Sequence, residues 1–380
     1  MESTLFEPEH DAFRDSVRSF MAKHVAPFHK EWEQAGIVDR SVWTEAGKQG
    51  LLGMDVPEQY GGGGIKDFRY NAVVSEEITR VGGSGVGFTL HNDVAAPYLI
   101  DLTTDEQKQR WLPPFVTGEM ITAIAMSEPG AGSDLQGLKT SARRDGTDWV
   151  INGSKTFITN GINSDLVLVV ARTDPEKGAH GFSIFAVERG MKGFERGRNL
   201  EKVGMKAQDT AELFFDEVRV PAENLVGREG GGFIHLMEKL PQERLSIAVV
   251  AAAASKKIFD ITLDYCKGRT AFGKPIGSFQ HNRFVLAEMA TEIEIARHYI
   301  DKAVLALNAG ELTVQDAAMA KWWTTELQKR VVDQCVQLHG GYGYMLEYPV
   351  AKAFIDSRVQ TIYGGTTEVM KEIIGRSLGV

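Results

Sequence analysis

Two glycine-containing segments combine residue types that can bind an anion or a flat polar ring. Residues 125–134 read AMSEPGAGSD, where glycines and hydroxyl side chains follow one expected strand and precede another. Such a loop offers backbone N–H groups and short side chains to a ligand, although its composition also fits a simple turn. Residues 337–344 read QLHGGYGY at an expected helix end, where they could form a helix C-cap and nothing more. Both segments are therefore candidate binding loops.

One glutamate is placed where it could act as a general base. Residues 240–245 read LPQERL, and Pro241 removes one hydrogen bond from any helix that contains it. Leu240 is a poor N-cap, so the segment predicts a kink within one long helix rather than a new helix start. Such a kink would aim Glu243 inward. By itself, Glu243 could equally pair with Arg244 or occupy a first helical turn, where glutamate is common.

The histidines and cysteines show no spacing typical of a metal site or a disulfide framework. His24 and His29 are five residues apart, and no cysteine or carboxylate completes a set of ligands. The two cysteines, Cys266 and Cys335, lie far apart in a chain large enough not to need disulfides. We therefore expect no metal, no disulfide and a reducing compartment.

Composition excludes several classes of protein. The chain has 380 residues, 43% of them hydrophobic and 24% charged, which are ordinary globular values. No stretch approaches the roughly 20 apolar residues of a membrane helix, so we expect a soluble protein that does not enter a membrane. The net charge of −9 argues against nucleic-acid binding. Residues 1–7 resemble no targeting peptide, which favours a cytoplasmic protein over a processed organellar form.

The pattern of apolar residues changes twice along the chain and predicts three domains. Residues 1–120 show helical spacing with glycine breaks at 61–64 and 82–83. Residues 121–229 show strand-length runs, at 149–151, 166–170, 182–187 and 213–215. Residues 230–380 return to long helical patterns, at 245–262, 284–307 and 314–338, which suggest a bundle. The absence of alternating strand and helix units excludes a Rossmann domain.

Two dipeptides in the middle part favour hairpin turns. Asp145-Gly146 and Asn152-Gly153 both tolerate positive φ, which tight hairpins require. Pro221 closes the last expected strand. We therefore expect antiparallel strands with turns at both dipeptides.

The motifs taken together resemble those of the acyl-CoA dehydrogenases. Residues 125–134 and 337–344 look like the two signature stretches of that family, and KTFITNG at 155–161, RTAFGK at 269–274 and IYGGTTE at 362–368 also match. The resemblance covers essentially the whole chain. It implies an N-terminal helical domain, a middle β-domain and a C-terminal four-helix bundle. It also implies a homotetramer, a dimer of dimers, in which each flavin touches two subunits.

The resemblance implies FAD as the cofactor and an acyl-CoA as the substrate. Met126, Ser127, Phe157 and Thr159 should lie against the flavin ring, with Ser133 near the pyrophosphate or the CoA. Arg269, Phe272, Gln280 and residues 337–341 should come from the neighbouring subunit. The expected cofactor-binding set is Ile124, Met126, Ser127, Gly132, Ser133, Phe157, Ile158, Thr159, Arg269, Phe272, Gln280, Gln337, Leu338, Gly340, Gly341, Thr366 and Glu368. The expected substrate-binding set is Ser133, Arg244, Tyr363, Gly364 and Gly365.

The family reaction removes an α-proton from a thioester while the β-hydrogen leaves as hydride to the flavin, so one base is needed. Many members place a glutamate just after the tyrosine that matches Tyr363, but this chain has Gly364 there. The segment at 240–245 resembles the stretch that supplies the base in the long-chain and isovaleryl branches. We therefore expect Glu243 to be the base and Arg244 to face the CoA. Gly364 would leave room for that carboxylate, and its N–H could bond the thioester oxygen.

Among the branches, the chain looks most like the long-chain acyl-CoA dehydrogenases, which pass electrons to an electron-transferring flavoprotein. Two alternatives remain at this stage. A catalytically silent scaffold that binds acyl-CoA would explain the missing glutamate at 364. An oxidase or flavin monooxygenase could use the same fold, although a base at Glu243 disfavours the monooxygenase.

Overall fold

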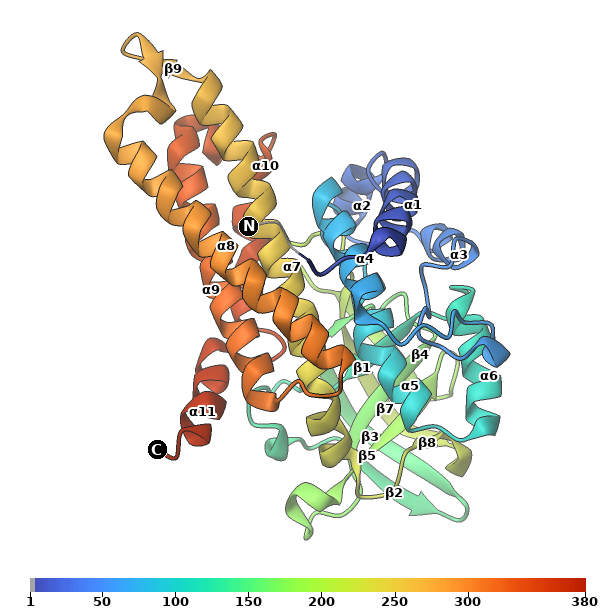
Figure 1. Cartoon of the computed structure of the whole chain (residues 1–380). Helices are drawn as coiled ribbons and strands as arrows, with labels where there is room; N and C mark the ends of the chain where they lie inside the picture. Colours follow the sequence, from blue (N-terminus) through green and yellow to red (C-terminus); the bar gives the residue numbers. More distant parts are fainter. Residues whose placement is uncertain (1–3) are drawn as a thin grey trace.

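The computed structural model describes residues 4–380 and shows a helical part, a β-sheet and a long helical bundle (Figure 1). The N-terminal part is built from helices and short turns, as its apolar spacing predicted. Its elements are α1 (Pro8–His24), α2 (His29–Ala35), α3 (Ser41–Lys48), η1 (Glu58–Tyr60), α4 (Phe68–Val81), η2 (Leu90–Ala95), α5 (Ala96–Asp101) and α6 (Asp105–Val116).

Local signals set the ends of these helices. Thr104 and Gln107 form a reciprocal capping box at the start of α6, with distances of 2.8 and 3.3 Å between side chain and backbone. Helix α4 begins after Asp67, whose side chain accepts from the Arg69 N–H, and ends at Gly82 with φ +73°. The glycine break predicted at 82–83 is therefore a helix C-cap.

The middle part is an eight-stranded sheet with the order β6-β7-β3-β2-β4-β5-β8 and β1 beside β4. The four strand-length runs recognised in the sequence all lie in strands. The pairings are mainly antiparallel, but β1 runs parallel to β4, which alternation of residues along the chain cannot reveal. The strands are β1 (Thr122–Ala125), β2 (Ser141–Asp145), β3 (Asp148–Thr159), β4 (Leu166–Arg172), β5 (Phe182–Glu188), β6 (Phe194–Asn199), β7 (Thr210–Val220) and β8 (Leu225–Val226).

One of the two predicted hairpin turns is wrong. Asp145-Gly146 does join β2 to β3, with Gly146 at φ +65°. Asn152-Gly153 instead lies inside β3, where the pairing with β7 shifts between Ile151 and Gly153. Gly153 has φ +147°, and a Cβ there would lie 2.7 Å from Thr140 Cα. Gly153 is therefore part of a β-bulge and lies close to the residue before β2, and it does not form a turn.

We expect Gly153→Ala to lower the free energy of unfolding by about 2 kcal/mol, because the new methyl group would press on the neighbouring strand. Gly375→Ala is the matched control, since Gly375 lies in a helix and its Cβ would meet nothing within 4 Å. Denaturant unfolding of both variants checks this. Equal stability of the two would contradict the close approach at Gly153.

The C-terminal part is a bundle that extends well beyond the sheet (Figure 1). Its three long helices pack against one another, and α10 and α11 pack on α9. Pro241 lies inside α7, so the prediction of one continuous helix rather than a new helix start is confirmed. The helices are α7 (Gly232–Gly268), α8 (Gln280–Asn308), α9 (Val314–His339), α10 (Pro349–Ser357) and α11 (Thr367–Ser377), with a small hairpin of β9 (Thr270–Ala271) and β10 (Lys274–Pro275) at the far end.

Helix α7 connects all three parts of the molecule. Leu245 and Val249 pack in one buried cluster with Phe68 of α4. Nine residues before Leu245, Leu236 packs in another cluster with Tyr98 of α5 and Phe182 of the sheet. The segment of α7 around Glu243 therefore lies between two well-packed contacts, which restrict its position.

Two further expectations concern cysteines and membranes. Cys266 and Cys335 are free thiols, and both are buried in the bundle. Among residues 4–380, no helix has the length and apolar character that crossing a membrane would require. The proposed domain limits at 120 and 229 fall just before β1 and α7, and they stay a prediction.

Candidate active site

Glu243 lies two residues after Pro241 in α7 and faces the loop that precedes α11. Its Oε1 is 3.8 Å from the position that a Cβ at Gly364 would occupy. Its Oε2 is buried and has no hydrogen-bond partner in the described part of the chain, although the residue as a whole is only half-buried. The carboxyl group therefore occupies the space beside Gly364 and has free capacity to accept a proton.

The surroundings of Glu243 give it the character of a base near neutral pH. Burial raises the pKa of its carboxyl to about 7, and the positive charges of Arg244 and Lys321 oppose that rise without cancelling it. A carboxyl with a pKa near the working pH can take up a proton and release it again.

The loop opposite Glu243 depends on two glycines. Gly364 has φ +63° and Gly365 φ +100°, values that side chains rarely adopt. A Cβ at Gly364 would lie 2.3 Å from Ile247 Cδ1 of α7. Lys321, fully buried in α9, donates from Nζ to the Gly365 carbonyl at 2.6 Å. A buried lysine that was not predicted from the sequence therefore holds this loop in place.

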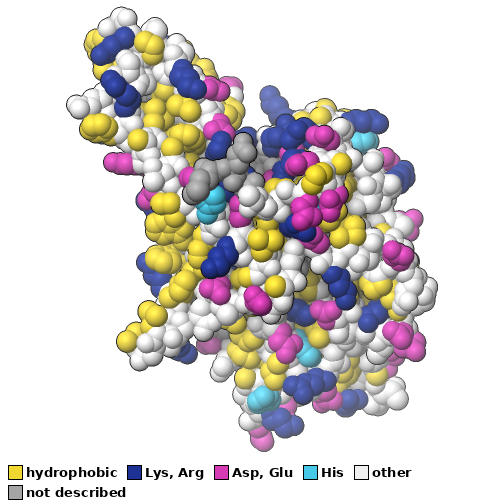
Figure 2. Space-filling model, in the orientation of Figure 1, with side chains coloured by type: hydrophobic (Ala, Val, Ile, Leu, Met, Phe, Trp, Pro, Cys, Tyr) yellow, Lys and Arg dark blue, Asp and Glu magenta, His cyan; other side chains and the backbone are white. Residues whose placement is uncertain are grey.

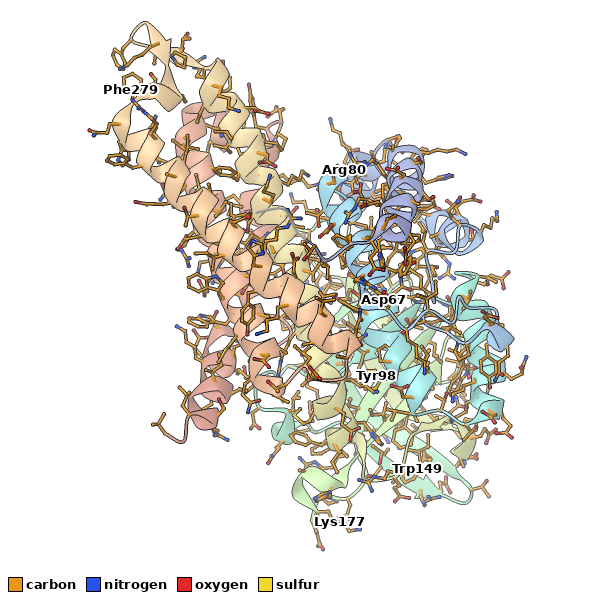
Figure 3. The ribbon with its side chains drawn as sticks, in the orientation of Figure 1. Asp67, Arg80, Tyr98, Trp149, Lys177 and Phe279 are labelled. Carbon is orange, nitrogen blue, oxygen red and sulfur yellow. The ribbon has the colours of Figure 1, made fainter. Side chains whose placement is uncertain are left out.

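Two more side chains near Glu243 have unused hydrogen-bonding groups. Tyr98, which is labelled in Figure 3, belongs to α5. It is 1% exposed, and its hydroxyl has no partner among the described residues. Burial and the Glu243 charge raise the pKa of this hydroxyl. Arg244 is buried, and its Nε likewise has no partner in residues 4–380. A buried guanidinium N–H without a partner is expected of a residue that contacts a ligand.

The loop at 125–134 is held by a buried ion pair. Lys155 Nζ lies 2.9 Å from Glu128 Oε1 and donates to the Met126 carbonyl at 3.0 Å. Glu128 also accepts from the backbone N–H groups of Lys139 and Thr140. Lys155 is fully buried and Glu128 nearly so. This pair connects the loop to β3, and it was not predicted, although both residues lie in the motifs already recognised.

Beside this loop, β3 carries an exposed aromatic residue whose backbone has an unusual conformation. Phe157 has φ +60° and is 69% exposed, and the pairing with β7 is irregular between Lys155 and Ile158. The Thr156 N–H donates to the Ser127 carbonyl at 3.0 Å, which brings the two predicted cofactor segments together. Strained residues of this kind are found at ligand sites.

The expected cofactor residues of this first region differ in what they can offer. Met126, Ser127 and Thr159 are half-buried, and Gly132 and Ser133 are exposed on the loop. Ile124 and Ile158 are buried in the core, so only their backbone groups are available. An exposed ring, a glycine-rich edge and half-buried hydroxyls fit a flavin, and these residues would hold its ring and pyrophosphate.

A second set of expected residues lies at the far end of the bundle. Arg269 lines a cavity of about 450 Å³ together with Gln337, Leu338, Gly340 and Gly341. Phe272 and Gln280 lie beyond it on the same end of the bundle, where Figure 3 labels Phe279. Phe272 is 95% exposed. Within one chain, this set is not brought together with the set around Met126 and Phe157.

The remaining expected residues flank the Gly364 loop. Tyr363 donates from its hydroxyl to Gln360 at 2.8 Å. Thr366 is the N-cap of α11, where its Oγ1 accepts from the Val369 N–H at 3.3 Å. Glu368 is exposed in the first turn of that helix. Tyr363 is therefore bonded within its own segment, and Thr366 and Glu368 belong to the start of α11.

Among residues 4–380, one group of possible metal ligands occurs, away from this site, at Glu7, Glu9 and His10. The His10 ring already bonds on both sides, since Nδ1 accepts from the Glu7 N–H and Nε2 lies 3.2 Å from Asp67. The absence of a metal stays a prediction.

Comparison with known proteins identifies the family. Models of the acyl-CoA dehydrogenase N-terminal, middle and C-terminal domains match residues 7–119, 123–218 and 230–379. The mitochondrial long-chain specific acyl-CoA dehydrogenase of Mus musculus is 53% identical over 98% of this chain and 87% of its own length. The mitochondrial isovaleryl-CoA dehydrogenase of Solanum tuberosum is 36% identical over 99% and 92%. The crystal structure of an acyl-CoA dehydrogenase from Geobacillus kaustophilus, 51% identical, matches with a TM-score of 0.98 over the whole of both chains. The chain belongs to the acyl-CoA dehydrogenase family, whose members are FAD-dependent oxidoreductases.

Proposed function

We propose that this protein desaturates long-chain fatty acyl-CoA thioesters between the α and β carbons, with Glu243 as the base. One observation carries the proposal: the Glu243 carboxyl, without a hydrogen-bond partner on Oε2, occupies the space beside Gly364 where other members carry their glutamate. The same observation counts against a silent scaffold, because the carboxylate missing at 364 is replaced from α7.

The residues of the chain divide the work of the reaction. Glu243 takes the α-proton, and its raised pKa makes it a stronger base than an ordinary carboxylate. The backbone N–H of Gly364 is proposed to bond the thioester oxygen, where negative charge develops. Arg244 and Tyr363 are proposed to orient the thioester and the CoA. When bound, FAD supplies the acceptor for the β-hydride.

The long-chain assignment rests on the greater identity to the mouse long-chain enzyme than to the potato isovaleryl enzyme. Anaerobic bleaching of the flavin by saturated acyl-CoAs of different chain lengths tests it. We expect the fastest bleaching with long chains, because each buried CH₂ group adds about 0.8 kcal/mol. A preference for short or branched esters would correct the substrate, and no bleaching with any ester would return us to the silent scaffold.

We expect the rate of flavin reduction at low acyl-CoA concentration to rise with pH around a midpoint near 7. Glu243 must be ionised to accept a proton, and below its pKa of about 7 it is protonated and inactive. Because an apolar acyl chain excludes more water, the midpoint with saturating substrate should be equal or higher. Stopped-flow measurement between pH 5.5 and 8.5 checks this. A rate that stays constant down to pH 5.5 would contradict a raised pKa.

The separation of the two cofactor regions supports a homotetramer in which two subunits complete each FAD site. Hydrophobic side chains are visible on the surface of the bundle in Figure 2. On α8, Phe284 and Ile295 are each 58% exposed, which also supports such an assembly. Light scattering of the purified protein tests the tetramer, and a monomer with full FAD content would reject it. An electron-transferring flavoprotein is the proposed acceptor and the cytoplasm the proposed location.

A further inference from the structure

Three consecutive polar residues are buried in the π-helical turn η2. His91, Asn92 and Asp93 are each 2% exposed or less. His91 bonds through its two ring nitrogens to Thr122 Oγ1 and the Phe115 carbonyl. π-helical turns are rare and are frequently found at functional sites. The two bonds of His91 therefore connect η2 to β1 and to α6.

Asn92 and Asp93 connect η2 to further parts of the chain. The Asn92 side chain donates to the Leu51 carbonyl at 2.8 Å and accepts from the Gly53 N–H at 3.0 Å. Asp93 Oδ1 accepts from Asn71 of α4 at 2.7 Å, and Oδ2 accepts from the hydroxyl of Ser246 of α7. The Asp93 carbonyl accepts from Gln242 Nε2 at 2.9 Å. Asp93 is therefore the residue through which η2 holds α7.

The two contacts on α7 fall on either side of the proposed base. Gln242 precedes Glu243 by one residue, and Ser246 follows it by three. Between them they fix the helical turn that carries Glu243 relative to the N-terminal part. This turn needs outside support, because Pro241 removes one of the helix's own hydrogen bonds there.

Burying a carboxylate costs more free energy than burying an apolar side chain. Burial raises the pKa of Asp93 to about 6, which reports the cost of keeping its charge in the interior. An apolar side chain would pack the same site at less cost, but it could not accept hydrogen bonds from Asn71 and Ser246. The hydrogen bonds of Asp93 are directional, and they therefore fix the orientation of α4 and α7 relative to η2.

We propose that Asp93 is a positioning residue for the reaction: by accepting from Ser246 it fixes the turn of α7 that holds Glu243 against the α-carbon of the substrate. The inference rests on the proposed function, because it requires Glu243 to be the base. The geometry of proton transfer is sensitive, and a misplacement of about 1 Å can cost on the order of 100-fold in rate.

The test compares variants that cut the same contact from either side. Ser246→Ala removes one hydroxyl, and Asp93→Leu removes the acceptor while keeping the branching of the side chain at Cγ. Asp93→Asn retains an acceptor oxygen for Ser246. Ser255→Ala is the matched control, because Ser255 is also buried on α7 but donates to the Ala251 carbonyl of its own helix at 2.8 Å.

The readout should report proton transfer alone. A 3-thia acyl-CoA has sulfur in place of the β-carbon, so its α-protons exchange with solvent at the base while hydride transfer cannot follow. Exchange of α-deuterium measured by mass spectrometry isolates the step performed by Glu243. Binding of the same ester and the midpoint of thermal unfolding are measured in parallel.

We expect Ser246→Ala and Asp93→Leu each to slow exchange by about tenfold to 100-fold with unchanged binding of the ester. The double variant should be no slower than the slower single variant, because both remove one contact. The exchange rates of Asp93→Asn and Ser255→Ala should stay within about threefold of the parent rate. This should hold even if Ser255→Ala lowers the unfolding midpoint as much as Ser246→Ala does.

Several results would overturn the proposal. Normal exchange in Ser246→Ala would do so, and this variant keeps the test valid if Asp93→Leu does not fold. A loss in Asp93→Asn equal to that in Asp93→Leu would assign the effect to charge instead. Normal exchange in Glu243→Gln would reject the proposed function itself, whereas loss there with normal exchange in Ser246→Ala would reject only the role of Asp93.

Discussion

Replacing Glu243 by glutamine should slow anaerobic flavin reduction by long-chain acyl-CoA by about 10³-fold, within the range that a positioned base contributes. Glutamine keeps the shape of the side chain but cannot take up the α-proton. The affinities for FAD and for the acyl-CoA should change little, because neither depends on the charge of one carboxyl. Stopped-flow absorbance of the flavin and equilibrium binding of a CoA ester measure the two quantities separately.

The control for this variant lies on the same helix. Glu238 is exposed and pairs at most with His235, so Glu238→Gln changes one carboxyl of α7 without touching the site. It should reduce its flavin at the parent rate. A Glu243→Gln enzyme with near-normal reduction would sink the assignment of the base, and equal loss in both variants would indicate a general effect on α7.

Much of the fold followed from periodicity. The change from helical spacing to strand-length runs near residue 121 matches the start of β1 at Thr122. The third part was anticipated as long helices, and α7 (Gly232–Gly268) does continue through Pro241, as the segment at 240–245 predicted. The bulge at Gly153 and the parallel pairing of β1 with β4 depend on a neighbouring strand, so no local pattern could announce them.

The candidate site was predictable only where a motif carried it. Glu243 emerged from two facts taken together, the glycine at 364 and the LPQERL segment. Lys321 and Asp93 did not emerge, because each bonds to a partner far away in the chain, Lys321 to Gly365 and Asp93 to Ser246. Tyr98 did not emerge either, because its place near Glu243 depends on the packing of α5 against α7. Such contacts are made by tertiary packing, and a buried polar residue looks like any other until its partner is known.

Replacing Lys155 by methionine should have the largest effect on stability, lowering the free energy of unfolding by about 3 to 5 kcal/mol. Lys155 is fully buried, and its loss leaves the Glu128 carboxylate without its cationic partner. The Met126 carbonyl also loses its donor, so the loop at 125–134 should hold FAD about tenfold more weakly, the equivalent of one hydrogen bond. Denaturant unfolding of the apoprotein and titration with FAD measure the two effects independently.

Two further variants test whether the loss of the ion pair between Lys155 and Glu128 causes the loss of stability and of FAD affinity. Adding Glu128→Gln to Lys155→Met removes the isolated charge, so part of the lost stability should return while FAD binding stays weak, because the Met126 carbonyl still lacks its donor. Arg143→Met breaks an exposed ion pair with Glu217 elsewhere in the sheet and should cost under about 1 kcal/mol. If Lys155→Met were no more destabilising than Arg143→Met, the ion pair would not support the fold. If the double variant also recovered FAD affinity, the isolated charge of Glu128, rather than the bond to Met126, would be what disturbs the cofactor loop.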